Sequence, residues 1–179
     1  MTPDRDNIRF NVLRNALYHS ARRRSLERKN RIFNFVVVIL GTAAFGDLFG
    51  MAPIGPEILG AAVAFIGALQ LVFDFGRQAR DHQALQREYY HLLADIEAAT
   101  DDGMEHCAEW WSRMIRITAD EPPVMKGLDA RAYNDAADAM ELPRGERLVV
   151  PYLHRMLAGI HPLDGHEYPK RSEIDQAKV

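Results

Sequence analysis

The sequence has one cysteine in 179 residues, so no disulfide can form within the chain. It also lacks the short motifs of common active sites, since no glycine-rich phosphate loop, GxSxG, HExxH or CxxC pattern occurs. His106 and Cys107 are adjacent and do not have the spacing of zinc ligands. These absences predict no catalytic residue, no metal site and no cofactor, and therefore a protein that is not an enzyme.

Positive charge is missing from the middle of the chain. Residues 1–31 hold nine Lys or Arg and three Asp or Glu, whereas residues 32–76 hold no Lys or Arg at all. The only charged residues in that middle stretch are Asp47, Glu57 and Asp74. The chain is 47% hydrophobic with a net charge of -3, which argues against disorder and against a strongly basic nucleic-acid-binding protein.

Two apolar runs occupy this middle stretch. The run Ile32–Gly50 has Asp47 as its only charge, and as a helix it would be about 28 Å long, close to the thickness of a hydrocarbon core. The run Ile58–Phe73 has no charge, and the glycines and prolines of residues 50–56 are typical of a chain reversal between them. Two core helices of a soluble protein are the alternative, but such helices normally keep a polar stripe. We therefore predict a two-span transmembrane helical hairpin.

Basic residues next to the two runs predict the orientation of the hairpin. They are Arg22, Arg23, Arg24, Arg28, Lys29 and Arg31 before the first run, and Arg77 and Arg80 after the second. The connecting loop has none, so both termini are expected in the cytoplasm. The same bases could form a nucleic-acid patch, but bases beside a span usually serve topology and anionic headgroups. The expected partner of these residues is membrane lipid and not nucleic acid.

The polar residues of the hairpin are candidates for the mouths of a pore. Asp47 and Glu57 flank the outer loop, Asp74 lies at the inner boundary, and Gln70 lies within the second run. Singly, each acid is explained by interfacial solvation. Together, in an oligomer, they would form acidic rings that favour cations.

Small residues in the second run suggest close helix packing. Gly60, Ala64 and Gly67 share one helical face, so two helix backbones could approach closely there, either within the hairpin or between copies. Because two helices cannot enclose an aqueous path, channel activity would require a homo-oligomer.

Helical periodicity continues on both sides of the hairpin. Residues 6–30 predict a helix that runs into the first span, and the apolar stripe of residues 85–96 predicts a helix that continues the second. We expect these two stripes to bury each other as a stalk. Further helices are expected at about residues 104–119, 128–140 and 148–160. The predicted fold is all-α, with a membrane hairpin and its flanking helices at residues 6–100, a C-terminal helical region at 101–162 and a polar tail at 163–179.

Several of these residues carry a resemblance to a known bacterial family. They are Tyr18-His19 before the arginine cluster and, after the second run, Arg77, His82, Leu85, Glu88-Tyr89 and Leu92, followed by the segment from Asp120-Glu121-Pro122-Pro123 to Ala137. Over roughly residues 8–140 this pattern resembles the SLATT domain, a two-span module of bacterial conflict systems. The resemblance implies an effector that oligomerises and perforates the inner membrane when a partner, a SMODS nucleotide synthase or a SLOG sensor, responds to a nucleotide signal.

Three functions are compatible with the sequence. The leading hypothesis is an antiviral, pore-forming membrane effector that conducts ions. The second is a non-conducting scaffold that recruits a cytoplasmic partner through Trp110, Trp111 or the turn at Glu121-Pro122-Pro123. The third is a phage holin, which is disfavoured because holins usually devote little sequence to a cytoplasmic part.

Overall fold

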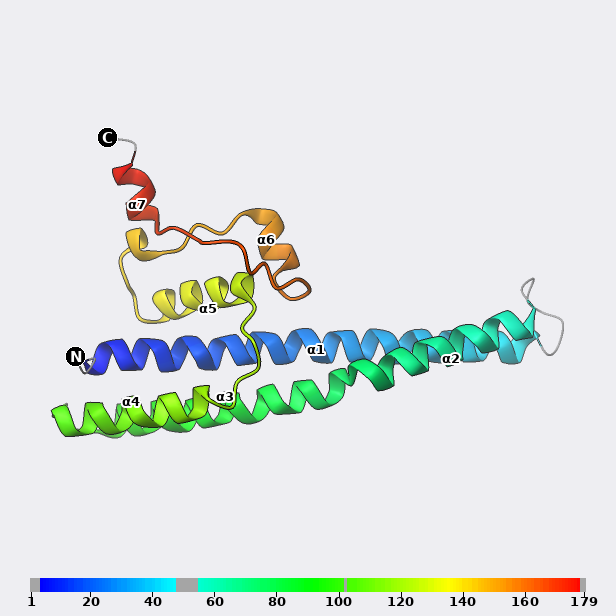
Figure 1. Cartoon of the computed structure of the whole chain (residues 1–179), viewed down its shortest axis with the longest axis horizontal. Helices are drawn as coiled ribbons and strands as arrows, with labels where there is room; N and C mark the ends of the chain where they lie inside the picture. Colours follow the sequence, from blue (N-terminus) through cyan, green and yellow to red (C-terminus); the bar gives the residue numbers. More distant parts are fainter. Residues whose placement is uncertain (1–3, 48–54, 102, 178–179) are drawn as a thin grey trace. The chain divides into compact units, whose positions relative to one another are not determined.

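The computed structural model describes residues 4–47, 55–101 and 103–177 (Figure 1). The helices are α1 (Arg5–Asp47), α2 (Pro56–Phe73), α3 (Phe75–Ala98), α4 (Met104–Thr118), α5 (Lys126–Ala139), the 3-10 turn η1 (Arg144–Glu146), α6 (Tyr152–Leu157) and α7 (Arg171–Gln176). Within these ranges there is no strand, only an isolated antiparallel bridge between Leu148 and Lys170. The predicted all-α class is therefore confirmed.

The chain divides into two compact units. Unit 1 comprises residues 1–22 and 82–179, and unit 2 comprises residues 23–81. The boundaries of these units differ from the domain boundaries expected from the sequence, because α1 and α3 each contribute residues to both units.

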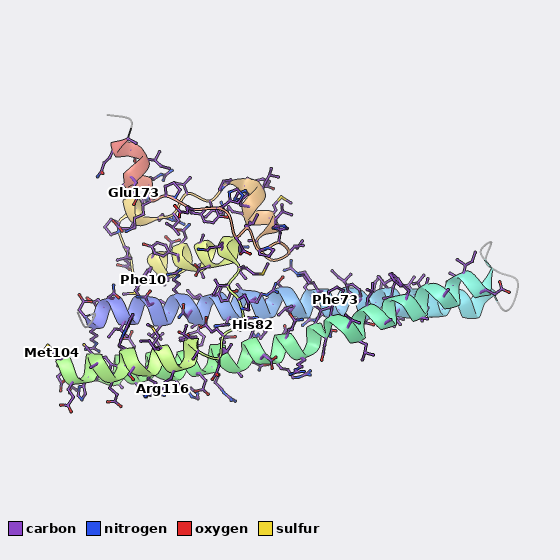
Figure 2. All side chains as sticks on the ribbon, in the orientation of Figure 1. Phe10, Phe73, His82, Met104, Arg116 and Glu173 are labelled. Carbon is purple, nitrogen blue, oxygen red and sulfur yellow. The ribbon has the colours of Figure 1, made fainter. Side chains whose placement is uncertain are left out.

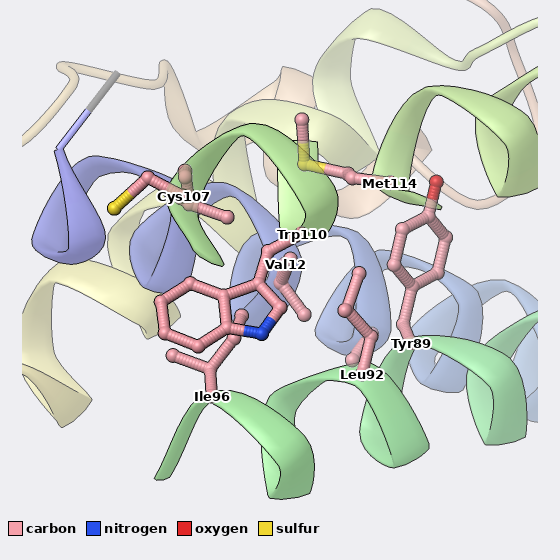
Figure 3. Packing of buried hydrophobic residues seen from close by; sticks show 9 residues of the cluster. Val12, Tyr89, Leu92, Ile96, Cys107, Trp110 and Met114 are labelled. Atoms are coloured by element: carbon pink, nitrogen blue, oxygen red, sulfur yellow. The ribbon is translucent and has the colours of Figure 1, made fainter. Parts of the chain in front are cut away.

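The core of unit 1 is built from the apolar stripes of three helices. Its members are Ile8, Val12 and Ala16 of α1, Tyr89, Leu92 and Ile96 of α3, and Cys107, Trp110 and Met114 of α4. Their spacing of three, four or seven residues puts each set on one helical face. In Figure 3 the side chain of Trp110 points toward Ile96 and Val12. The predicted contact between the helices that flank the hairpin is confirmed, and α4 completes the cluster.

Helix α5 packs on the first part of α1 through a second apolar cluster. The cluster comprises Tyr18, Met125, Leu128, Ala132 and Ala158, with Leu17 and Ala21 against it. Gly127 allows the segment around Ala158 and Leu163 to approach α5 closely, because a Cβ there would lie 2.7 Å from Leu163 Cδ1. An ion pair between Arg14 and Asp129 joins the two helices at the rim of the cluster. Both clusters hold the C-terminal region to α1 within unit 1.

The last predicted helix is shorter than expected. The sequence predicts a helix over residues 148–160, whereas α6 covers only Tyr152–Leu157 and begins after Pro151. A proline disfavours helical backbone in the residue before it, so Val150 cannot continue a helix into Pro151. Leu148 is extended instead, and the Asn134 side chain binds both its carbonyl oxygen (2.9 Å) and its N–H (2.8 Å).

The expected polar tail is also more ordered than predicted. Leu163 is buried, and helix α7 follows at Arg171–Gln176. The Val149 N–H donates to the Pro169 carbonyl oxygen at 2.9 Å, and the Arg171 N–H donates to that of Arg147, also at 2.9 Å. Backbone hydrogen bonds of this kind leave no pattern of side chains in the sequence, so the polar composition of the segment did not indicate them.

In unit 2, the second part of α1 and helix α2 lie side by side and antiparallel (Figure 1). Gln70 Nε2 donates to Asn34 Oδ1 at 2.7 Å, and the Phe33 and Phe75 rings lie 5.4 Å apart. The outer faces of both helices carry large exposed apolar side chains, among them Phe73 (Figure 2).

By length and composition, one described helical stretch could cross a membrane. It is Glu57–Ala98, which combines α2 and α3, and only 6% of its apolar window is buried. Helix α1 is described as far as Asp47, so part of the first predicted span and most of the reversal at residues 50–56 lie outside the described residues. The described residues thus contain one helix long and apolar enough to cross a membrane, and the second predicted span is not shown.

Asp74 separates α2 from α3. It has left-handed backbone geometry (φ 38°, ψ 56°), its N–H donates to the Gln70 carbonyl oxygen, and its Oδ1 accepts from the Arg77 N–H at 3.0 Å. One residue thus ends one helix and caps the next. The predicted continuous helix is interrupted at this residue alone.

We expect Asp74→Ala to lower the free energy of unfolding by about 1–2 kcal/mol, because alanine removes the cap and tolerates left-handed geometry poorly. Asp74→Asn keeps a side-chain acceptor and should remain within about 0.5 kcal/mol of the wild type. Thermal unfolding in detergent, followed by circular dichroism, measures both. Identical melting of the two variants would contradict the capping role.

Candidate functional site

The predicted pore residues do not converge in the structure. Glu57 is exposed in the first turn of α2, and Asp74 caps its other end. Gln70 is held by Asn34, and Asp47 is the last residue of α1, with a side chain outside the described part of the structure. Within one chain these residues form no common site, so their role as pore mouths stays a prediction about an oligomer.

The small-residue face of α2 is open. Gly60 and Ala64 are exposed and Gly67 is half-buried. A Cβ on Gly60 or Gly67 would meet no described atom of the surrounding chain within 4 Å. Of the two kinds of packing expected from these residues, contact between copies is therefore the one that this face leaves room for.

The bases that flank the apolar runs do not form a common site either. Arg24, Arg28, Arg31, Arg77 and Arg80 are exposed, and Arg23 and Arg31 lie 3.7 and 3.8 Å from Glu27. Lys29 lies over the Phe75 ring. Arg22 differs from them because it is half-buried in unit 1, where its Nη1 donates to the Gly159 carbonyl oxygen at 3.3 Å. Burial lowers the pKa of Arg22.

A buried polar network lies in unit 1 instead. His19 of α1 is fully buried and His82 of α3 is 5% exposed, and their Nδ1 atoms are 2.8 Å apart. His19 Nε2 lies 3.1 Å from Glu121 Oε1, and the Tyr89 hydroxyl donates to the same oxygen. The Thr118 hydroxyl lies 2.9 Å from that of Tyr89. The network thus joins α1, α3 and the segment that follows α4.

The acceptor at Glu121 fixes the direction of the hydrogen bonds. A carboxylate only accepts, so His19 Nε2 carries a proton and donates it to Glu121. In a neutral His19 ring the Nδ1 atom is then the acceptor, and His82 Nδ1 donates to it. This contact needs one Nδ1 without a proton, so the two rings cannot both be cations while it exists.

Burial also changes the proton affinities in the network. It lowers the pKa of His82 to about 4, with a further lowering from the charges of His19 and Arg22. Burial likewise raises the pKa of Tyr89, and the hydrogen bond to Glu121 adds to this rise. Burial also raises the pKa of Tyr18. His82 is therefore neutral at physiological pH and the tyrosines keep their protons.

The network holds helices of unit 1 together. Among the described residues, no three His, Cys, Asp or Glu side chains are placed to hold a metal ion. Each bond joins elements distant in sequence, such as His19 to Glu121. The chemistry available is hydrogen bonding and proton uptake.

The positions of the two histidines in the sequence are a signal for this network. Tyr18-His19, His82, Tyr89 and Glu121 all belong to the pattern that resembles the SLATT domain, but the sequence does not indicate that they bond to one another. His19 lies seven residues after Val12, and His82 lies seven residues before Tyr89, so both imidazoles lie on the apolar stripes of their helices. A polar side chain in such a stripe needs a buried partner, which only the folded chain identifies.

Comparison with known proteins adds no assignment. No family model, no curated protein and no solved structure is significantly similar to this chain.

Proposed function

We propose that unit 2 crosses the bacterial inner membrane as a two-span hairpin with both termini in the cytoplasm. The observation that carries this proposal is the exposed apolar surface of α1 and α2. Its large side chains are Ile32, Phe35, Val38 and Ile39 of α1, and Ile58, Phe65, Leu71, Val72 and Phe73 of α2. A core helix of a soluble protein would bury such side chains, whereas lipid covers them in a membrane.

The second part of α1 supplies the other span. From Ile32 to Asp47 it has no charge before its last residue, which amounts to about 24 Å of helix. Because α1 and α2 are antiparallel, the basic ends of the two apolar runs, at Arg31 and Arg77, belong to the same end of the hairpin. This arrangement supports a cytoplasmic location for both flanks.

We further propose that several hairpins assemble into an ion-permeable pore, as the resemblance to the SLATT domain implies. The open face at Gly60 and Ala64 supports contacts between copies, since a face without a Cβ lets helix backbones approach closely. Glu57 would lie near the outer mouth and Asp74 near the inner one, where acids favour cations. The trigger would be a nucleotide synthase or sensor protein bound in the cytoplasm.

The proposal predicts depolarisation of bacteria that express the full chain, measured with a potential-sensitive dye after membrane insertion has been verified. Stable membrane potential in cells that carry the inserted oligomer would contradict the pore.

Gly67→Leu should weaken assembly. An extra side chain at a close helix contact costs about 1–3 kcal/mol, which is about 5- to 150-fold in the dissociation constant. Gly41→Leu is the matched control, because Gly41 lies in the apolar run of α1 and also has open space around its Cβ position. Crosslinking and analytical ultracentrifugation in detergent measure assembly. Equal assembly of both variants would argue against the face at Gly67.

A membrane-anchored scaffold is the alternative, and one observation favours it. Trp110 is 6% exposed and Glu121 is bonded within the network, so these two predicted docking residues are not available to a partner. Helix α6 and the turn after it instead present exposed apolar side chains, namely Tyr152, Leu153, Met156, Leu157 and Ile160. A scaffold would leave the membrane potential unchanged.

A further inference from the structure

Unit 1 contains an open cleft of about 430 Å³ that the function proposed above does not use. It lies among α5, η1, the extended residues 147–150, α6 and α7. Five arginines line it, namely Arg131, Arg144, Arg147, Arg155 and Arg171. Asp135 is the only acid of the lining, so the cleft carries four more positive than negative charges.

Most of these guanidinium groups have no ion-pair partner among the described residues. Arg147 pairs with Asp138 at 2.9 Å, whereas the other four have no carboxylate within ion-pair distance in that part of the chain. Arg131, Arg144, Arg155 and Arg171 are exposed, so their donors are available to a ligand. Like charges gathered around one cleft repel each other, and a bound anion would offset that repulsion.

The backbone around the cleft is held in place independently of any ligand. Arg131 and Asn134 lie three residues apart on one face of α5, and Asn134 fixes Leu148 through two hydrogen bonds. The bond from the Arg171 N–H to the Arg147 carbonyl oxygen then ties α7 to this extended segment. Val150 also lines the cleft, and its N–H has no acceptor in the described part of the chain. The cleft therefore offers a backbone N–H donor in addition to the guanidinium donors.

We propose that this cleft binds a small ligand with two or more phosphate groups, of the size of a nucleoside di- or triphosphate. A guanidinium matches phosphate oxygens with two parallel hydrogen bonds, and several guanidiniums call for several negative charges, more than one carboxylate supplies. The volume lies within the range of about 300–1,000 Å³ of small-molecule sites. A flat nucleic-acid surface would not need such a concave site. The proposal holds whether or not unit 2 conducts ions.

Isothermal titration of the full-length protein in detergent with ATP, pyrophosphate and orthophosphate tests this proposal. The double variant Arg144→Gln/Arg171→Gln should bind ATP at least about tenfold more weakly, because it removes charge-assisted bonds to phosphate at two positions. The control is Arg87→Gln/Arg116→Gln, which removes the same charge from exposed positions outside the cleft and should bind as the wild type does. Circular dichroism verifies the fold, and Arg131→Gln/Arg155→Gln provides a second cleft variant.

A phosphorylated lipid headgroup could supply the same chemistry as a soluble nucleotide. Titration of the same protein in detergent with micelle-dissolved phosphatidylinositol 4-phosphate separates the two sources. If only binding of this lipid distinguishes the cleft variants from the control, the phosphates belong to a lipid, and if only ATP binding does, they belong to a soluble ligand. Wild-type protein that binds neither probe, or cleft variants that bind as tightly as the control, would overturn the proposal.

Discussion

Replacement of Glu121 by alanine is expected to destabilise the protein by about 3–5 kcal/mol, because two buried donors lose their acceptor and each such loss costs about 1–3 kcal/mol. The Glu121 side chain is only 9% exposed, and its Oε1 accepts hydrogen bonds from both His19 Nε2 and the Tyr89 hydroxyl. Alanine would leave both donors buried without an acceptor. The expected fall in Tm is roughly 6–20 °C for a chain of this size, measured by circular dichroism in detergent.

Glu121→Gln is the matched control for this prediction. Both hydrogen bonds end on one oxygen, and glutamine keeps an oxygen at that position while it removes the charge. We expect this variant to lose at most about 2 kcal/mol, since converting each of the two charge-assisted bonds into a neutral one costs about 1 kcal/mol. If Glu121→Gln were as unstable as Glu121→Ala, the charge of Glu121 and not its acceptor geometry would hold the network.

The same contacts affect how a role for the C-terminal region is tested. A chain that ends at Gly103 would lose Cys107, Trp110 and Met114, three members of the core cluster, and Glu121 with them. His19 and the apolar stripe of α1 would then be uncovered. A change of activity in such a truncated chain would therefore reflect misfolding as well as the loss of any control by the C-terminal region. Comparison of Glu121→Ala with Glu121→Gln is the cleaner test.

Helical periodicity predicted most of the fold because it reports directly which face of each helix is buried. The stripes of α1, α3 and α4 were readable in this way, and the core cluster joins them. Periodicity failed after Pro143, where backbone contacts decide the structure. The extended Leu148 and the bond between Val149 and Pro169 depend on residues that carry no apolar pattern.

The candidate sites were less predictable than the fold. The sequence identifies which residues are polar, but the distance between His19 and His82, 63 positions apart, exists only once α1 and α3 have paired. The five arginines of the cleft come from five separate segments and share no spacing. In contrast, the apolar runs of α1 and α2 could be identified directly, because the length and composition of such a run are local properties of the sequence.

The stability of the protein should fall as the pH drops from about 6.5 to about 4. Burial holds the pKa of His82 at about 4 in the folded chain, below its ordinary value of 6.5, with further lowering from His19 and Arg22 and an opposing effect of Glu121. Between these two pH values the unfolded chain binds a proton that the folded chain does not, so protons favour unfolding. The contribution of His82 is complete above pH 6.5 and amounts to about 3 kcal/mol, since one pKa unit is worth about 1.4 kcal/mol.

Chemical denaturation in detergent across this pH range measures the effect, and two asparagine variants isolate it. His82→Asn keeps an N–H near the donor position of His82 Nδ1 but does not titrate, so the part of the slope that comes from His82 should disappear. His91→Asn removes an exposed histidine from the same helix and should keep the wild-type slope. Parallel curves for His82→Asn and the wild type would refute the assignment. Protonation of a buried imidazole opposes the packing that buries it. If the stability of the wild type falls more steeply with pH than that of His82→Asn, His82 is therefore the residue through which acid weakens the contact between α1 and α3.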